Sequence, residues 1–160
     1  MWGERQVQLR AGVKVLTDPE LYHNRPDIVV ILTNRKIVYV LEIAVAHPQN
    51  IHLQENIKIT RYSKNSTLHI TNDNYDTVAR NYNLLEAMSI MHKCPTKLAV
   101  LVFGAFGEVL ETKNHMDAIA ILKSLGVQGG RLKSLLEQCS YNVATSSAKI
   151  LIRRLTPGRI

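Results

Sequence analysis

The stretch DIVVILTNRKIVYVLEIAV, residues 27–45, decides the fold. It holds two nearly continuous apolar runs, DIVVILT (27–33) and IVYVLEIAV (37–45), which are short and rich in β-branched residues. Runs of this kind are typical of buried central strands. Because only three residues separate them, we predict a tight hairpin whose two-residue turn is Asn34-Arg35.

Two acids interrupt these apolar runs, and the hairpin predicts where they meet. With a two-residue turn, Asp27 lies opposite Glu42 on one face of the sheet, with Cβ atoms roughly 4.5–5.5 Å apart. A three-residue turn would instead put the two acids on opposite faces. Carboxylates this close repel each other unless a cation or a proton lies between them. The pair therefore predicts a site for Mg²⁺, or Mn²⁺; the alternative is a structural role in which Glu42 pairs with a nearby Lys or Arg.

The rest of the chain predicts a mixed α/β fold. Strands are expected at residues 7–16, which mostly alternate between apolar and polar, and at residues 97–103, which end before Gly104. Helices are expected at 50–62, 75–89, 117–125, 131–138 and 143–155, and a polar loop at 63–73. This order implies a mixed central sheet of about four strands with helices packed on it. We expect one domain over residues 1–160, with a core at 7–126 and C-terminal helices at 131–155.

Composition narrows the class of protein. An apolar fraction of 46% excludes wholesale disorder, and the two cysteines have no zinc-site spacing. No stretch resembles a membrane span or a secretory signal, so an intracellular chain is expected. Twenty Lys and Arg against 13 Asp and Glu give a formal charge of +7. That excess favours polyanionic partners, although plain solubility would also explain it.

The blocks around the acidic pair resemble a known family. Arg25-Pro26-Asp27 followed by Glu42 resembles the PD-(D/E)xK signature of the restriction-endonuclease-like superfamily. The wider blocks resemble the endonuclease-like domain downstream of reverse transcriptase in non-LTR retrotransposon polyproteins. These blocks are NRPDIVVIL (24–32), YVLEIAVAHPQNI (39–51), Lys58 to Tyr62, LVFGAFGEV (101–109) and TSSAKILIRRL (145–155). The resemblance covers most of residues 10–155.

The resemblance implies magnesium-dependent nicking of target DNA, in the nucleus, by a fragment of a larger polyprotein. Asp27 and Glu42 would be the metal ligands. The lysine of the superfamily motif falls at Ala44, and the resemblance implies that Lys58 on the following helix replaces it, with Tyr62, one turn later on the same face, as a further catalytic residue. Lys58 would orient or activate water, or stabilise charge on the phosphate. The alternative is an ordinary solvated helix lysine.

Basic side chains supply candidate contacts to a nucleic-acid backbone, and they are equally consistent with solvated surfaces. These are Arg25 and Arg61 beside the motif blocks, and Lys149, Arg153 and Arg154 in the last predicted helix. His23, ahead of the PD block, is either a phosphate contact or a solvated loop histidine. The expected partner is DNA, or else RNA, with no membrane and no small-molecule cofactor besides the metal. Two functions stay open: a Mg²⁺-dependent DNA endonuclease, or a catalytically inactive nucleic-acid-binding module of a retroelement polyprotein.

Overall fold

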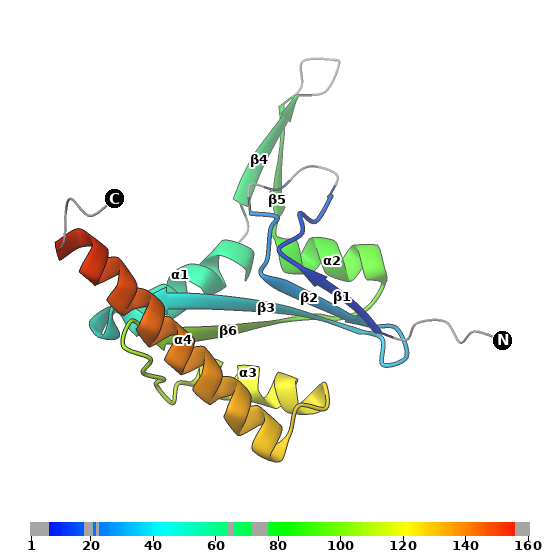
Figure 1. Cartoon of the computed structure of the whole chain (residues 1–160). Coiled ribbons are helices and arrows are strands. Elements are labelled where there is room, and N and C mark those ends of the chain that lie inside the picture. Colours follow the sequence, from blue (N-terminus) through cyan, green and yellow to red (C-terminus); the bar gives the residue numbers. More distant parts are fainter. Residues whose placement is uncertain (1–6, 18–20, 22, 64–65, 72–76, 156–160) are drawn as a thin grey trace. The chain divides into compact units, whose positions relative to one another are not determined.

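The structure, a computed structural model, describes residues 7–17, 21, 23–63, 66–71 and 77–155 (Figure 1). Its main sheet has four strands in the order β1(Val7–Ala11), β2(Ile28–Leu32), β3(Ile37–Ala46) and β6(Thr96–Gly104). β1 pairs with β2, and β2 with β3, in antiparallel fashion. β6 runs parallel to β3, because Val38 N–H donates to Pro95 near the start of both strands and Ala105 N–H donates to Ala46 near their ends. The expected mixed four-stranded sheet is confirmed.

Four α-helices flank this sheet. A 3₁₀ turn, η1(Pro48–Asn50), leads into α1(Ile51–Ser63), and α2(Leu84–His92), α3(Lys113–Ser124) and α4(Gly129–Leu155) follow. Side-chain caps fix two of the starts: Asn83 accepts the N–H of Glu86, and Thr112 accepts the N–H of His115. Within the described part of the chain, no helix is long and apolar enough to cross a membrane.

The β2–β3 hairpin has the predicted register but a longer loop. Ile28 pairs with Leu41 and Leu32 pairs with Ile37, which is the register of the two-residue turn. The strands stop at that last pair, so the loop is Thr33 to Lys36. A two-residue turn of the favoured type needs a positive φ at both central residues, which an arginine resists. The positive φ falls instead at Lys36, at 49°.

Side chains along the hairpin alternate between the two faces of the sheet, and those on one face form a hydrophobic core. Val29 and Ile31 of β2 and Val40 of β3 are buried on one face, and they cluster with Leu84 and Met88 of α2. Each such side chain, when fully buried, stabilises the fold by about 1.5–3 kcal/mol. This core holds the start of β2 and the middle of β3 in fixed positions.

Several expected elements differ in the structure. Residues 66–71, expected in a loop, form β4(Ser66–Thr71), which pairs with β5(Thr77–Tyr82) as an antiparallel ribbon. The helix expected at 75–89 therefore starts only at α2, and residues 75 and 76 of the predicted range lie outside the described residues. The two helices expected at 131–138 and 143–155 are the single helix α4, because no Gly or Pro interrupts the chain between them. The strand expected at 7–16 ends at Ala11, where Gly12 takes a φ of 59°.

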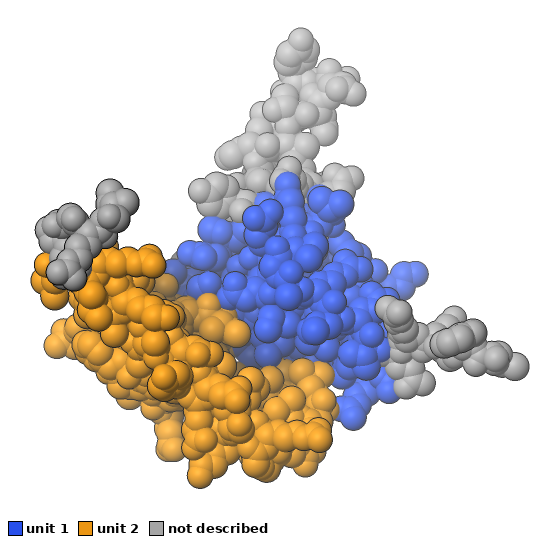
Figure 2. Space-filling model, viewed as in Figure 1, with its two compact units in different colours: residues 1–42, 56–99 blue, residues 43–55, 100–160 orange. Residues whose placement is uncertain are grey.

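The chain divides into two compact units (Figure 2). Unit 1 comprises residues 1–42 and 56–99, and unit 2 comprises residues 43–55 and 100–160. In unit 2, Glu55 is only 4% exposed, and its carboxylate accepts the Thr112 hydroxyl at 2.5 Å and the Asn114 amide at 3.4 Å. These hydrogen bonds compensate the burial of its charge.

Candidate active site

The acidic pair lies in unit 1, where the hairpin brings it together. Asp27 immediately precedes β2 and Glu42 lies in β3, one position beyond the Ile28–Leu41 pair. The two residues thus continue the predicted register on the face that carries Val29 and Val40. Contact is direct, because the backbone N–H of Asp27 donates to Oε1 of Glu42 at 2.8 Å.

Lys58 of α1 supplies the positive charge of the site. Its Nζ lies 2.6 Å from Oε2 of Glu42 and 3.9 Å from Oδ2 of Asp27. The Glu42 side chain is 1% exposed and Lys58 13%, whereas Asp27 is 44% exposed. A buried carboxylate needs such a partner, since an unpaired charge in this position is costly. Glu42 is therefore the buried anchor of the site, and Asp27 is its solvent-facing acid.

Tyr62, one turn after Lys58 on α1, positions the loop that carries Asp27. Its ring is 3% exposed, and its hydroxyl donates to the backbone carbonyl of Arg25 at 3.1 Å. Burial and then the nearby Glu42 carboxylate raise the pKa of Tyr62 above its usual range, so the phenol stays protonated. Tyr62 thus acts through the Arg25–Asp27 segment, as a positioning residue.

A hollow of about 370 Å³ lies beside this group, lined by His23, Asn56, Ile57, Thr60 and Arg61. The His23 ring meets the Tyr62 ring edge to face, with centroids 6.5 Å apart. Burial and then the Arg61 guanidinium lower the pKa of His23. A neutral imidazole beside a guanidinium can donate hydrogen bonds to a phosphate. The sequence did not indicate Asn56 and Thr60 as site residues. Their spacing of four residues, which places them on one side of α1, was the one feature that could have identified them.

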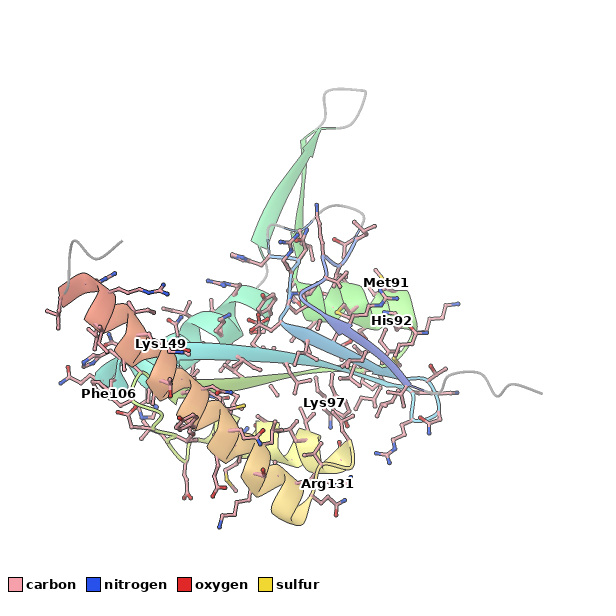
Figure 3. The ribbon with its side chains drawn as sticks, viewed as in Figure 1. Met91, His92, Lys97, Phe106, Arg131 and Lys149 are labelled. Carbon is pink, nitrogen blue, oxygen red and sulfur yellow. The ribbon has the colours of Figure 1, made fainter. Side chains whose placement is uncertain are left out.

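The other expected basic contacts are divided between the two units. Arg25 is exposed beside the acidic pair, in unit 1. The remaining three belong to α4 of unit 2, where all are exposed: Lys149, labelled in Figure 3, Arg153 and Arg154. Lys149 and Arg153 are four residues apart and so share one side of the helix.

The donor chemistry fits a hard divalent cation. Among the residues that the structure describes, no group of three or more His, Cys, Asp and Glu side chains is placed to hold a metal ion. Mg²⁺ needs fewer, because it is commonly held by one or two carboxylates together with water and substrate phosphate. Asp27 and Glu42 are two such carboxylates. The Asp27 side chain is 44% exposed and that of Glu42 1%, so Asp27 is the more accessible ligand.

No protein-family model, curated protein or solved structure matches this chain. Function is therefore inferred from the geometry of the site and from the sequence blocks around it.

Proposed function

We propose that this chain is a restriction-endonuclease-like domain that hydrolyses phosphodiester bonds in DNA with Mg²⁺ or Mn²⁺, as the domain of non-LTR retrotransposon polyproteins does. The observation that carries the proposal is the meeting of Asp27, Glu42 and Lys58 at one end of a buried hairpin. Two carboxylates and a lysine are the groups that such hydrolysis uses. In a retroelement polyprotein, the target would be chromosomal DNA in the nucleus.

Each residue has a distinct role in this proposal. Asp27 and Glu42 would hold the ion, which when bound supplies charge to activate water and to stabilise the scissile phosphate. The Lys58 ammonium would donate a hydrogen bond to the attacking water or to a phosphate oxygen as negative charge develops there. The oxygen of water forms the new bond to phosphorus and its proton passes to solvent, while the bond from phosphorus to the leaving oxygen breaks and that oxygen takes up a proton from solvent. Tyr62 keeps Asp27 in place through Arg25.

Surface charge supports a nucleic-acid substrate. The chain carries a formal net charge of +7, and Arg61 and His23 line the hollow beside the acidic pair. The Arg61 guanidinium would contact a phosphate that flanks the cleaved bond and would release condensed counterions, and the His23 imidazole would donate a hydrogen bond beside it.

A second candidate function is a nucleic-acid-binding module without catalysis. It is favoured by the short contact between Lys58 and Glu42, which compensates the buried carboxylate without any metal. Ala44, in place of the motif lysine, points the same way. In this case the Lys58–Glu42 pair would be a structural ion pair, and the basic surface would still bind DNA.

Nicking of supercoiled plasmid separates the two functions. We expect wild type to nick in Mg²⁺ or Mn²⁺ and not with a chelator. Asp27→Asn should be slower by about 100-fold or more, because it removes a ligand charge from a half-exposed position. Asp117→Asn is the matched control, because it removes a 52% exposed carboxylate that pairs with Lys113 in unit 2. Salt-sensitive DNA binding without nicking would leave the binding module as the function.

A further inference from the structure

A second cavity in unit 1, called here the basic pocket, has a volume of about 610 Å³. Its walls come from β1, the end of β2, the β2–β3 loop and the C-terminal end of α2 with the two residues after it. They are lined by Gln8, Arg10, Ile31, Leu32, Thr33, Lys36, His92, Lys93 and Cys94.

The charge in the basic pocket is entirely positive. Arg10, Lys36 and Lys93 each carry a permanent cation, and no described residue that lines the pocket is acidic. Within the described part of the chain, none of the three forms an ion pair with a carboxylate. Burial and then the Arg10 charge lower the pKa of His92, so its imidazole is neutral near pH 7 and can donate a hydrogen bond. Such a wall is complementary to an anion with several oxygens.

Backbone conformation singles out the same pocket. Lys36 and Lys93 have φ values of 49° and 52°, and they are the non-glycine residues with positive φ in the described chain. Lys93 caps the C-terminus of α2, a position that favours Gly or Asn. A lysine in the left-handed region costs conformational energy. Two such residues at one cavity, both cations, point to a ligand that needs their charge.

The basic pocket lies on the same face of the sheet as the acidic pair, and it extends from Arg10, level with Val29, to the loop beyond the far end of β2. Arg10 is paired with Val29 and Gln8 with Ile31, so their side chains share the face that Asp27 also uses. Asp27 precedes β2 and Thr33 follows it. Six residues of extended chain separate Asp27 from Thr33, at the far end of the pocket, which is about 20 Å at about 3.3 Å per residue. Duplex DNA rises about 3.4 Å per base pair, so this distance matches roughly six base pairs.

We propose that the basic pocket binds a backbone phosphate of the duplex roughly six base pairs from the bond cleaved at Asp27 and Glu42. The position of the cleaved bond rests on the proposed function, whereas the binding of a duplex phosphate does not. The pocket therefore determines the length of duplex that the domain must contact on one side of the cleaved bond.

The test removes the pocket's charge and keeps its backbone. Lys36→Asn with Lys93→Asn does both, because asparagine tolerates positive φ. Arg10→Gln on the exposed strand β1 is a second variant, in case the first does not fold. Lys97→Gln is the matched control: Leu98 packs on the core, so Lys97 points to the other side of the sheet from His92 (Figure 3).

Binding is measured with a chelator and in the Asp27→Asn background, so that no cleavage is required. For a duplex of about 24 base pairs, the slope of log affinity against log salt should fall in magnitude by about 1 to 2 in the pocket variants. Their affinity near 0.1 M salt should fall roughly tenfold, and a duplex of about 8 base pairs should be affected less. Lys97→Gln should behave as its parent does.

Three results would overturn the proposal. The first is a salt slope that is unchanged in the pocket variants, and the second is an equal loss of duplex affinity in Lys97→Gln. In the third, inorganic phosphate binds the pocket, but long duplexes bind the variants as tightly as their parent. The last result would identify a small-anion site. Failure of the proposed function has a different signature: wild type would not nick plasmid, while the pocket variants would still lose duplex affinity.

Discussion

Removal of Lys58 should cost the fold more than the loss of any exposed ion pair, because Glu42 then stays buried without a cation. The Glu42 side chain is 1% exposed, and Lys58 Nζ lies 2.6 Å from it. Breaking a buried pair by removing one partner costs about 3–5 kcal/mol, and we expect Lys58→Met to lower the free energy of unfolding by this amount. Glu42→Gln should cost less, because the lysine chain can turn its ammonium toward water.

The double variant tests the cause of this loss. With a carboxamide at position 42, no buried charge is left for Lys58 to compensate, and the amide oxygen can still accept the Asp27 N–H. The double variant should therefore recover at least about 1.5 kcal/mol of the summed single losses, measured by urea unfolding at pH 7. The control cycle is Lys113→Met with Asp117→Asn, an exposed pair at 3.1 Å, whose coupling should stay below about 0.5 kcal/mol. Additivity of Lys58→Met and Glu42→Gln within about 0.5 kcal/mol would refute the buried pair.

Three further outcomes follow from the same geometry. Tyr62→Phe removes the hydroxyl that holds the loop before Asp27. The free energy of unfolding should therefore drop by about 0.5–1.5 kcal/mol, and nicking should slow. Unchanged nicking in a folded variant would contradict the positioning role. Gly107→Ala should destabilise the fold by more than about 1 kcal/mol in thermal unfolding. The φ of Gly107 is 90°, and the new Cβ would lie 2.7 Å from the Ser140 carbonyl oxygen. An unchanged stability would contradict that contact. Burial chiefly lowers the pKa of His115 below 6.5, so below that pH the unfolded chain binds a proton that the folded chain excludes. Stability should then fall as pH drops below 6.5, by at most about 1.4 kcal/mol per pH unit, and His115→Gln should flatten this slope whereas His52→Gln, 71% exposed, should not.

The hairpin was predictable because strand alternation leaves few choices. A register that buries Val29 against Val40 also places Asp27 beside Glu42, and a shift by one residue would turn apolar side chains away from the core. Loop length was less constrained, because two-residue and four-residue loops preserve the same pairing. The chain takes the longer loop, with Lys36 in the left-handed region.

The ribbon of β4 and β5 shows why local patterns fail. Residues 75–89 have apolar side chains at helical spacing, yet the helix starts only after Asn83. β4 pairs with β5, the next strand along the chain, and this pairing overrides the helical periodicity of residues 77–82. The basic pocket was not predictable because β1, a loop and the end of α2 meet only in the fold.

The sequence indicated the residues of the candidate site and the meeting of Asp27 with Glu42, but it did not indicate which groups Lys58 and Tyr62 contact. The sequence blocks identified Lys58 and Tyr62, but the group that each of them contacts depends on how its side chain is buried. The structure pairs Lys58 with Glu42 and turns the Tyr62 hydroxyl toward the Arg25 carbonyl. A lysine and a tyrosine one helical turn apart could have faced solvent together, and only the packing of α1 decides otherwise.

The most direct test of a hydrolytic site at Asp27 and Glu42 is the single-turnover rate of plasmid nicking in Mg²⁺. Wild type and Asp117→Asn should nick at the same rate, and Asp27→Asn should be slower by about 100-fold or more while its Tm is unchanged. Equal rates for wild type and Asp27→Asn, or nicking that persists in a chelator, would contradict a metal-dependent site at this pair.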